Sequence, residues 1–197
     1  FIDVLSSVAE SMIVNNYADH IYTLSKGVSW ITFQNECVAV RIDDQLCKQG
    51  KGITLYSAFK QNLKGDKIYT VFEDSEGDEW ILTNKGISIV GKKQVDSDFP
   101  FQYIKEADGI IYLVSQSDKL ASYNFKSRQF KFIEIPYHVS MINEVKKFDS
   151  NTLLLATDNG LIIYKIKEKK FQLIDIRTST QPSSVVQSVY QDHYKEL

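Results

Sequence analysis

The chain has 197 residues, a length that suits one domain or part of one. It carries 23 Lys and Arg against 25 Asp and Glu, so its charge of −2 gives no reason to expect nucleic acid or an anionic membrane as a partner. Its apolar runs are far shorter than the ~20 residues that span a bilayer. The start of the chain, Phe1–Leu5, lacks the basic region and cleavage site of a signal peptide. The chain also begins without Met, so we expect a piece of a longer protein.

Short runs of β-branched and aromatic residues, broken by turn formers, predict an all-β chain. Phe1–Leu5 is read as the last strand of a preceding repeat, or else as a short helix. Four groups of four strands follow. The first two groups are Ala18–Leu24, Val28–Phe33, Cys37–Ile42 and Ile53–Ser57, then Lys67–Phe72, Glu79–Thr83, Ile87–Val90 and a weak outer strand at Gln94–Asp96. The next two are Phe101–Glu106, Ile110–Ser115, Leu120–Phe125 and Gln129–Ile135, then Ile142–Phe148, Thr152–Thr157, Leu161–Ile166 and Phe171–Ile176. Val185–Tyr190 is expected to begin a fifth group.

Residues in the turns and residues in the connectors both support this division. Asn84-Lys85-Gly86 and Asp158-Asn159-Gly160 occupy the same place in the second and fourth groups, and glycine supplies the positive φ that tight hairpin turns need. The three prolines, Pro100, Pro136 and Pro182, each fall between the last strand of one group and the first strand of the next. Proline cannot donate to a strand ladder and is tolerated in such connectors.

Four antiparallel strands per repeat, with a period near ~40 residues, predict the blades of a β-propeller. We expect a partial β-propeller of about four four-stranded antiparallel blades plus flanking single strands, with blades at 18–57, 67–96, 101–135 and 142–176, and 185–190 as the first strand of a further blade. Trp30, Trp80, Tyr112 and Leu154 are expected in the core between blades. The alternative for the tryptophans is sugar stacking on an exposed rim.

The second repeat, FEDSEGDEWILTNKGI, and the fourth, TLLLATDNGLIIY, resemble the two-component regulator propeller repeat. The first and third repeats share only its strand spacing, because they lack the Thr-x-x-Gly turn. The repeat is typical of the periplasmic sensor regions of hybrid two-component histidine kinases from gut Bacteroidetes. The resemblance implies more blades, and hence an open arc of a larger propeller in the periplasmic part of an inner-membrane protein.

The same resemblance implies that such a sensor binds oligosaccharides released from glycans and passes the signal through a transmembrane helix to a histidine kinase core. It implies as partners the oligosaccharide, the remainder of the same propeller and receptor chain, and a homodimer of the full-length receptor. None of the signalling machinery lies within these residues.

The residues themselves offer little for catalysis. His20, His138 and His193 lack the spacing of a metal site or of a base–nucleophile pair, and Asp43-Asp44, Asp74 and Asp78 lie at turns, where carboxylates cap backbone amides. We expect no enzyme activity in this fragment, no cofactor and no metal. A carbohydrate-active enzyme whose carboxylates come from different blades remains an alternative, as does a propeller that binds only proteins.

Ligands of propellers are expected at connector loops and at the turns between second and third strands, since loops on a rigid scaffold carry function. The polar candidates there are Tyr137, His138, Asn84, Lys85, Asp158 and Asn159. The last four are also simply good hairpin-turn residues, so Tyr137 and His138 are preferred.

Cys37 and Cys47 flank Asp43-Asp44, the expected turn between the third and fourth strands. A hairpin centred near Ile42 brings the two cysteines within disulfide reach, whereas a turn centred on the Asp pair moves them out of register. Two free thiols are the favoured interpretation.

Overall fold

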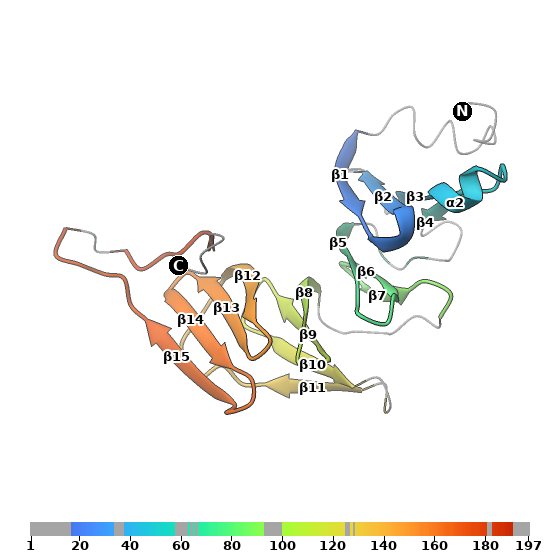
Figure 1. Cartoon of the computed structure of the whole chain (residues 1–197). Helices are drawn as coiled ribbons and strands as arrows, with labels where there is room; N and C mark the ends of the chain where they lie inside the picture. The colour runs from blue at the N-terminus through green and yellow to red at the C-terminus, as the bar shows by residue number, and fades with distance from the viewer. Residues whose placement is uncertain are drawn as a thin grey trace. The chain divides into compact units, whose positions relative to one another are not determined.

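The computed structural model describes residues 17–33, 38–57, 63, 65, 67–92, 100–124, 127, 129–180 and 183–190. The chain divides into two compact units, Phe1–Pro100 and Phe101–Leu197. The described strands form four antiparallel sheets in which strands consecutive in the chain are neighbours (Figure 1). This up-and-down order agrees with the predicted series of hairpins.

The first unit contains two sheets. One has the order β1 (Ala18–Thr23), β2 (Val28–Phe33), β3 (Val38–Asp43) and β4 (Ile53–Ser57), with the short 3-10 turn η1 (Ser25–Gly27) between β1 and β2. The other has β5 (Ile68–Glu73), β6 (Glu79–Thr83) and β7 (Gly86–Ile89). Its described part has three strands, because the expected outer strand at Gln94–Asp96 lies outside the described residues.

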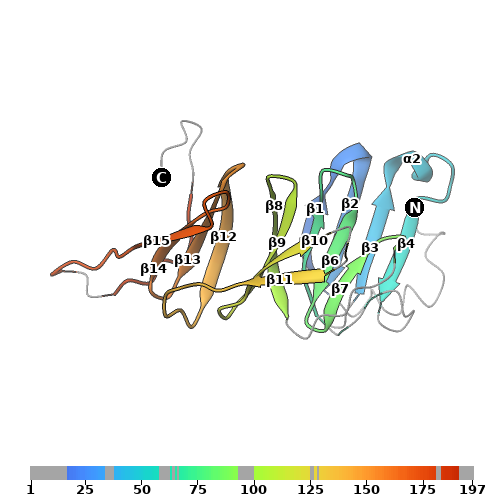
Figure 2. The ribbon, with the colours of Figure 1, turned by 90° about the horizontal axis from the view of Figure 1, so that it is seen from below.

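The second unit also contains two sheets. The first has β8 (Phe101–Ala107), β9 (Ile110–Ser115), β10 (Leu120–Asn124) and β11 (Gln129–Ile133). The second has β12 (Ile142–Asp149), β13 (Thr152–Thr157), β14 (Gly160–Lys165) and β15 (Lys170–Ile174). The first strands of the two sheets, β8 and β12, are the ones that lie side by side (Figure 2).

The same irregularity recurs at the start of all four first strands. The register between the first and second strands shifts between Ala18 and His20, between Ile68 and Thr70, between Phe101 and Tyr103, and between Ile142 and Glu144. A β-bulge bends a strand and re-aims the side chain that it inserts. Recurrence at one position indicates that the four sheets are copies of one structural unit.

The connection between β3 and β4 differs from the predicted hairpin turn. It contains the single-turn helix α2 (Asp44–Cys47), whose first turn is capped by the Asp43 carboxylate, which accepts from the backbone amides of Gln45 and Leu46. Local hydrogen bonding by an aspartate therefore produced a helical turn where a bare reversal was expected. Cys47 is a free thiol within this helix, and Cys37 lies outside the described residues.

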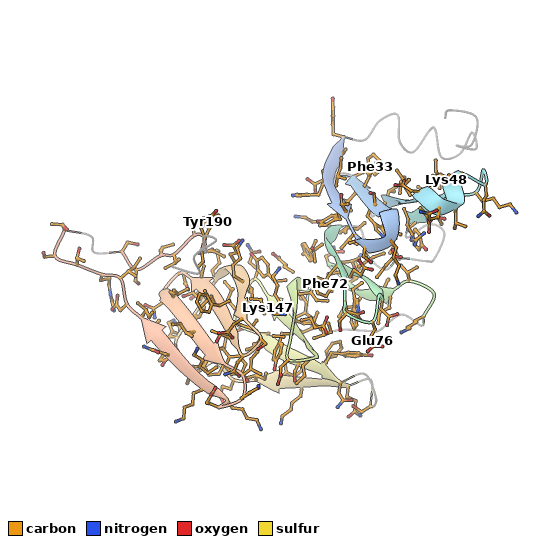
Figure 3. The ribbon with its side chains drawn as sticks, viewed as in Figure 1. Phe33, Lys48, Phe72, Glu76, Lys147 and Tyr190 are labelled. Carbon is orange, nitrogen blue, oxygen red and sulfur yellow. The ribbon has the colours of Figure 1, made fainter. Side chains whose placement is uncertain are left out.

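The prediction of a strand at Val185–Tyr190 is wrong, because this segment is irregular in the structure. Its Val186 amide donates to the Thr157 carbonyl at 2.8 Å, and the Asn143 side chain donates to the Val186 carbonyl at 2.8 Å. These are isolated bonds and do not form a ladder. Tyr190 at its end is 80% exposed (Figure 3). Phe1–Leu5 lies outside the described residues.

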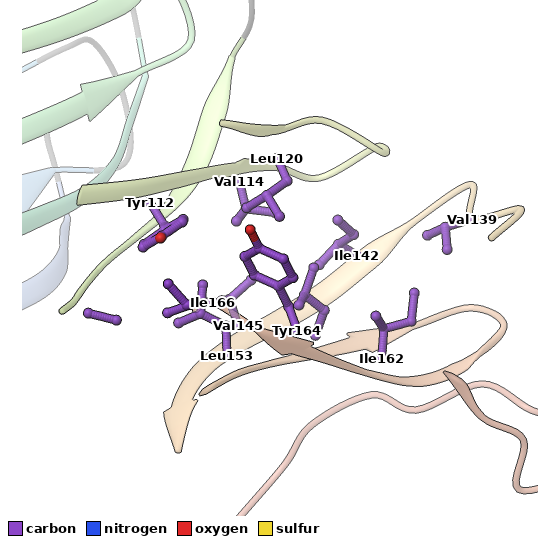
Figure 4. Close-up of a cluster of buried hydrophobic side chains, with 12 residues drawn as sticks. Tyr112, Val114, Leu120, Val139, Ile142, Val145, Leu153, Ile162, Tyr164 and Ile166 are labelled. Atoms are coloured by element: carbon purple, nitrogen blue, oxygen red, sulfur yellow. The ribbon is translucent and has the colours of Figure 1, made fainter. Parts of the chain in front are cut away.

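Apolar side chains fill the space between the two sheets of each unit. In the second unit, Val114 and Leu120 meet Ile142, Val145, Leu153 and Ile162, with the rings of Tyr112 and Tyr164 packed edge to face among them (Figure 4). In the first unit, Val28, Trp30 and Ala39 pack with Ile68, Val71 and Ile81. The four expected core anchors are buried, with Trp30 and Trp80 at 0%, Leu154 at 2% and Tyr112 at 3% exposure.

No helix in the described ranges has the length and apolar character that crossing a membrane requires.

Candidate functional site

The two matching turns share one hydrogen-bonded frame. In the β6–β7 turn the Thr83 hydroxyl donates to the Gly86 carbonyl at 3.0 Å and accepts from the Lys85 amide at 3.3 Å. In the β13–β14 turn the Thr157 hydroxyl donates to the Gly160 carbonyl at 2.7 Å and accepts from the Asn159 amide at 3.1 Å. The Thr-x-x-Gly pattern is therefore a turn device: the hydroxyl satisfies one donor and one acceptor that the hairpin leaves open.

In the second unit this turn holds the connector that precedes β12. The Asp158 carboxylate accepts from the Ser140 amide at 3.1 and 3.3 Å, and the Asn159 side-chain amide donates to the His138 carbonyl at 3.0 Å. The Tyr137 hydroxyl donates to the Phe171 carbonyl at 3.2 Å. The structure thus brings together four predicted site residues: Tyr137, His138, Asp158 and Asn159. The side chains of Tyr137, Asp158 and Asn159 form hydrogen bonds with the backbone.

The segment that follows β15 completes the group. The Ser184 hydroxyl donates to the Asn159 side-chain oxygen at 3.4 Å, and the Val186 amide donates to the Thr157 carbonyl. We call the residues Tyr137–Met141, Asp158–Asn159 and Ser184–Val185 the connector cluster. Its outward parts are the exposed His138 side chain, Met141 at 45% exposure and Val185 at 39%. Polar groups hold the frame of this cluster, while an imidazole and two apolar side chains remain accessible on it.

Asn84 and Lys85 belong to the other unit. The Asn84 side-chain oxygen accepts from the Lys67 amide at 3.3 Å, and its backbone amide donates to the Lys67 carbonyl at 3.1 Å. Asn84 therefore accepts from a backbone amide just before β5, as Asp158 accepts from one just before β12. Lys85 is exposed at the tip of the turn.

Met141, Ser184 and Val185 were missed by the sequence interpretation. A signal for them exists, because Ser140-Met141-Ile142 stands before the fourth strand group as Ser184-Val185-Val186 stands where a fifth group was expected to begin. Aligning the repeats at this serine places Met141 and Val185 in the same position.

The acidic pair of the second repeat has structural partners. Glu73 at the end of β5 accepts from both the backbone amide, at 2.6 Å, and the hydroxyl, at 2.5 Å, of Ser25 in the first sheet. The Ser25 hydroxyl bond is the main reason that the pKa of Glu73 lies below its usual value. Asp74 is 6% exposed and accepts from the amides of Glu76 and Asp78 and from the Trp80 indole N–H, the last at 2.8 Å. These carboxylates join strands and turns, as capping residues do.

A second carboxylate joins the two sheets of the first unit. Glu79 on β6 accepts from the Arg41 guanidinium at 2.7, 2.9 and 3.1 Å and from the Trp30 indole N–H at 2.6 Å. Arg41 and Glu79 are 16% and 12% exposed, and the hydrogen bond to Glu79 is the main cause that raises the pKa of Arg41. A two-pronged pair of this kind fixes direction as well as distance. We assign this network to inter-sheet packing.

Across the residues that the structure describes, no group of three His, Cys, Asp or Glu side chains could hold a metal ion. His20 is partnered with Asp19 at 3.3 Å on β1. His193 lies outside the described residues.

Comparison with solved structures identifies the architecture. The extracellular domain of the putative hybrid two component system BT4673 from B. thetaiotaomicron matches 91% of this chain and 25% of its own, at 18% identity and a TM-score of 0.69. The extracellular domain of the putative hybrid two component system BT3049 from B. thetaiotaomicron matches 90% of this chain and 24% of its own, at 19% identity and a TM-score of 0.66. Virginiamycin B lyase from Staphylococcus aureus matches 81% of this chain and 55% of its own, at 18% identity and a TM-score of 0.64.

The fold is that of β-propeller blades. The likeness between this chain and extracellular domains of hybrid two-component systems, first read from two repeats, is confirmed at the level of the fold. The chain spans about a quarter of the length of these domains. No protein-family model matches the sequence, and no curated protein sequence matches it. Because the propeller fold also serves a lyase, the absence of enzyme activity stays a prediction.

Proposed function

We propose that this chain is part of the extracellular ligand-sensing propeller of a two-component sensor and that it recognises an oligosaccharide at the connector cluster. The fold likeness to extracellular domains of such systems supports the sensor role. The repeat resemblance supports a sugar ligand, a position in the periplasm, and a membrane helix and histidine kinase core elsewhere in the full protein. It also supports both units being successive parts of one propeller.

The choice of site rests on one observation: in the connector cluster, some side chains hold the backbone by hydrogen bonds and others stay exposed. Asn159, Asp158 and Tyr137 hold the backbone, and Ser184 ties the following segment to the same turn. The His138 side chain is exposed on a connector whose backbone is fixed by these hydrogen bonds. Small-molecule sites combine a preformed frame with apolar contacts and a few polar groups, and Met141 and Val185 supply the apolar contacts here.

The test is a binding screen of the full chain against a panel of neutral and acidic oligosaccharides by ligand-observed NMR, followed by calorimetry on any hit. His138→Ala should weaken binding about tenfold or more, the effect of losing one good hydrogen bond. Lys167→Ala is the matched control, because Lys167 is exposed in the β14–β15 turn at the other end of the same sheet.

Three outcomes contradict the proposal. Binding that His138→Ala leaves unchanged removes the connector cluster from the site. Failure of every sugar, together with capture of a protein partner through this surface, favours a protein-interaction propeller. Hydrolysis or elimination products in the sugar samples favour a carbohydrate-active enzyme.

A further inference from the structure

The start of β5 and the β6–β7 turn form a second polar surface, which lies in the first unit and is separate from the connector cluster. The Asn84 backbone amide donates to the Lys67 carbonyl at 3.1 Å, and the Lys67 amide donates to the Asn84 side-chain oxygen at 3.3 Å. These two bonds hold the residue just before β5 against the turn. Lys85 follows Asn84 at the tip of that turn and is exposed, as Lys67 is. Two exposed lysines thus start from neighbouring backbone positions.

The β-bulge at the start of β5 adds an aromatic ring to this surface. The register between β5 and β6 shifts between Ile68 and Thr70, so Tyr69 is the inserted residue. A bulge re-aims the side chain that it inserts, and bulges are common beside active sites. The Lys67 ammonium stands over the Tyr69 ring, 5.5 Å from its centre. The half-buried ring and the ammonium therefore lie on one side of the strand.

At the corresponding place the second unit has no lysine. There the Asp158 amide donates to the Met141 carbonyl at 3.1 Å, as the Asn84 amide donates to the Lys67 carbonyl in the first unit. Lys67 therefore corresponds to Met141 of the connector cluster, and the neutral Asn84 corresponds to the Asp158 carboxylate. The two units share the hydrogen-bonded frame, but the first unit presents positive charge on it where the second presents a thioether.

We propose that Lys67, Tyr69 and Lys85 form a binding site for an acidic sugar unit, one that carries a carboxylate or a sulfate group. In the part of the chain that the structure describes, the Lys67 ammonium contacts the Tyr69 ring and pairs with no carboxylate. A cation–π contact at the surface is weaker than a charge-assisted hydrogen bond, so the ammonium turns from the ring to an anion that reaches it. The ring is then free to pack against the apolar face of the sugar. Lys85 supplies a second ammonium on a flexible stem.

The choice of a sugar as the carrier of the anionic group rests on the proposed function. The site itself belongs to the other unit and shares no residue with the connector cluster.

The test titrates the full chain separately with D-glucuronate, D-glucose 6-sulfate and D-glucose, and with sodium acetate as an anion that has no ring. Sodium chloride keeps the ionic strength equal, and NMR follows the ε-methylene groups of Lys67 and Lys85 and the ring of Tyr69. We expect saturable shifts with one or both acidic sugars, at a concentration about tenfold lower than with glucose and about threefold lower than with acetate. The acidic sugar that saturates at the lower concentration distinguishes a carboxylate site from a sulfate site.

Matched variants separate binding from folding. Lys67→Met gives this place the side chain that the second unit has there, and it should weaken binding of the acidic sugars about tenfold or more. Tyr69→Gln matches Gln102, the inserted residue of the β8 bulge, and should weaken the acidic sugars about threefold while leaving acetate unchanged. Lys51→Met is the control and should leave binding unchanged, because Lys51 is exposed between β3 and β4 of the other sheet.

The proposal is overturned if neither acidic sugar gives saturable shifts at Lys67 and Tyr69. It is also overturned if acetate saturates as readily as the acidic sugars, which would make this an adventitious anion site only, or if Lys67→Met, still folded by circular dichroism, binds them as before. His138→Ala decides the connector cluster and Lys67→Met decides this site, so the two proposals fail separately.

Discussion

Asp74 offers the sharpest test of how the repeat motif stabilises a blade. Its carboxylate accepts three hydrogen bonds, from the amides of Glu76 and Asp78 and from the Trp80 indole. The two amides belong to a turn with access to water, whereas the Trp80 ring is 0% exposed. The indole N–H therefore loses a buried hydrogen bond when the carboxylate is changed, and water does not reach it as it reaches the turn. Asp74→Asn should destabilise the first unit by about 2 kcal/mol, the cost of one buried donor left without its charged acceptor.

The asparagine amide cannot restore the bonds by rotation. If its oxygen faces the two turn amides, its NH₂ group faces the indole N–H, and two donors meet. If it turns over, the turn amides lose their acceptor. Trp80→Phe removes the N–H and leaves a cavity, so by itself it should cost ~1–3 kcal/mol. The double variant should be more stable than the sum of the two single changes predicts, by about 1 kcal/mol.

Urea unfolding followed by tryptophan fluorescence measures these values in the full chain. The chain has two tryptophans, Trp30 and Trp80, and both lie in the first unit, so the signal reports that unit alone. Asp44→Asn, an exposed aspartate in α2, is the control and should leave the midpoint unchanged. A loss below ~0.5 kcal/mol for Asp74→Asn, or additive single and double variants, would refute the reasoning.

Three further predictions concern other contacts. Arg41→Met should destabilise the first unit by about 2–3 kcal/mol in the same fluorescence assay, because Glu79 keeps its charge and loses its main partner. Burial raises the pKa of Tyr112 from 10.0 to about 12, so the stability that its neutral form gives the native state is present below pH ~10 and is lost as the pH rises from about 10 through about 12. Tyrosinate absorbance and circular dichroism should therefore change together in this pH range. Both changes should be smaller in Tyr112→Phe. Gly160→Ala should cost ~1–3 kcal/mol by circular dichroism, because φ is 103° and a Cβ would lie 2.5 Å from the Ile174 carbonyl oxygen; an unchanged midpoint would contradict this.

The strand pattern could be predicted from the sequence because its causes are local. Alternation of apolar and polar residues, glycine at the hairpin turns and proline in the connectors act within a few residues. The expected ranges therefore have the same bounds as five of the described strands, namely β2, β4, β6, β9 and β13. The same reasoning missed α2, where the Asp43 carboxylate offered the chain a local alternative to a plain reversal. It also predicted a strand at Val185–Tyr190, where an apolar pattern is present but no continuous ladder is formed beside it.

The sequence predicted which residues come together at the candidate site, but it did not predict which of their groups are left for a ligand. Tyr137, His138, Asp158 and Asn159 do come together, since a connector and a turn at one end of one sheet must be neighbours. Which of their groups are left for a ligand depended on tertiary contacts. Asn159 meets a carbonyl 21 residues away, and the Tyr137 hydroxyl meets one 34 residues away.

Arg41 and Lys105 show what only the tertiary structure decided. Along the chain both are basic residues in strands, with nothing to distinguish them. Arg41 meets Glu79, which lies 38 residues away in the next sheet, and becomes a buried link between sheets. Lys105 lies on a strand beside β12, and burial is the main cause that lowers its pKa. The sign of a charge is written in the sequence, but its energy depends on distance and on exclusion of water, and both are set by which strands the fold places face to face.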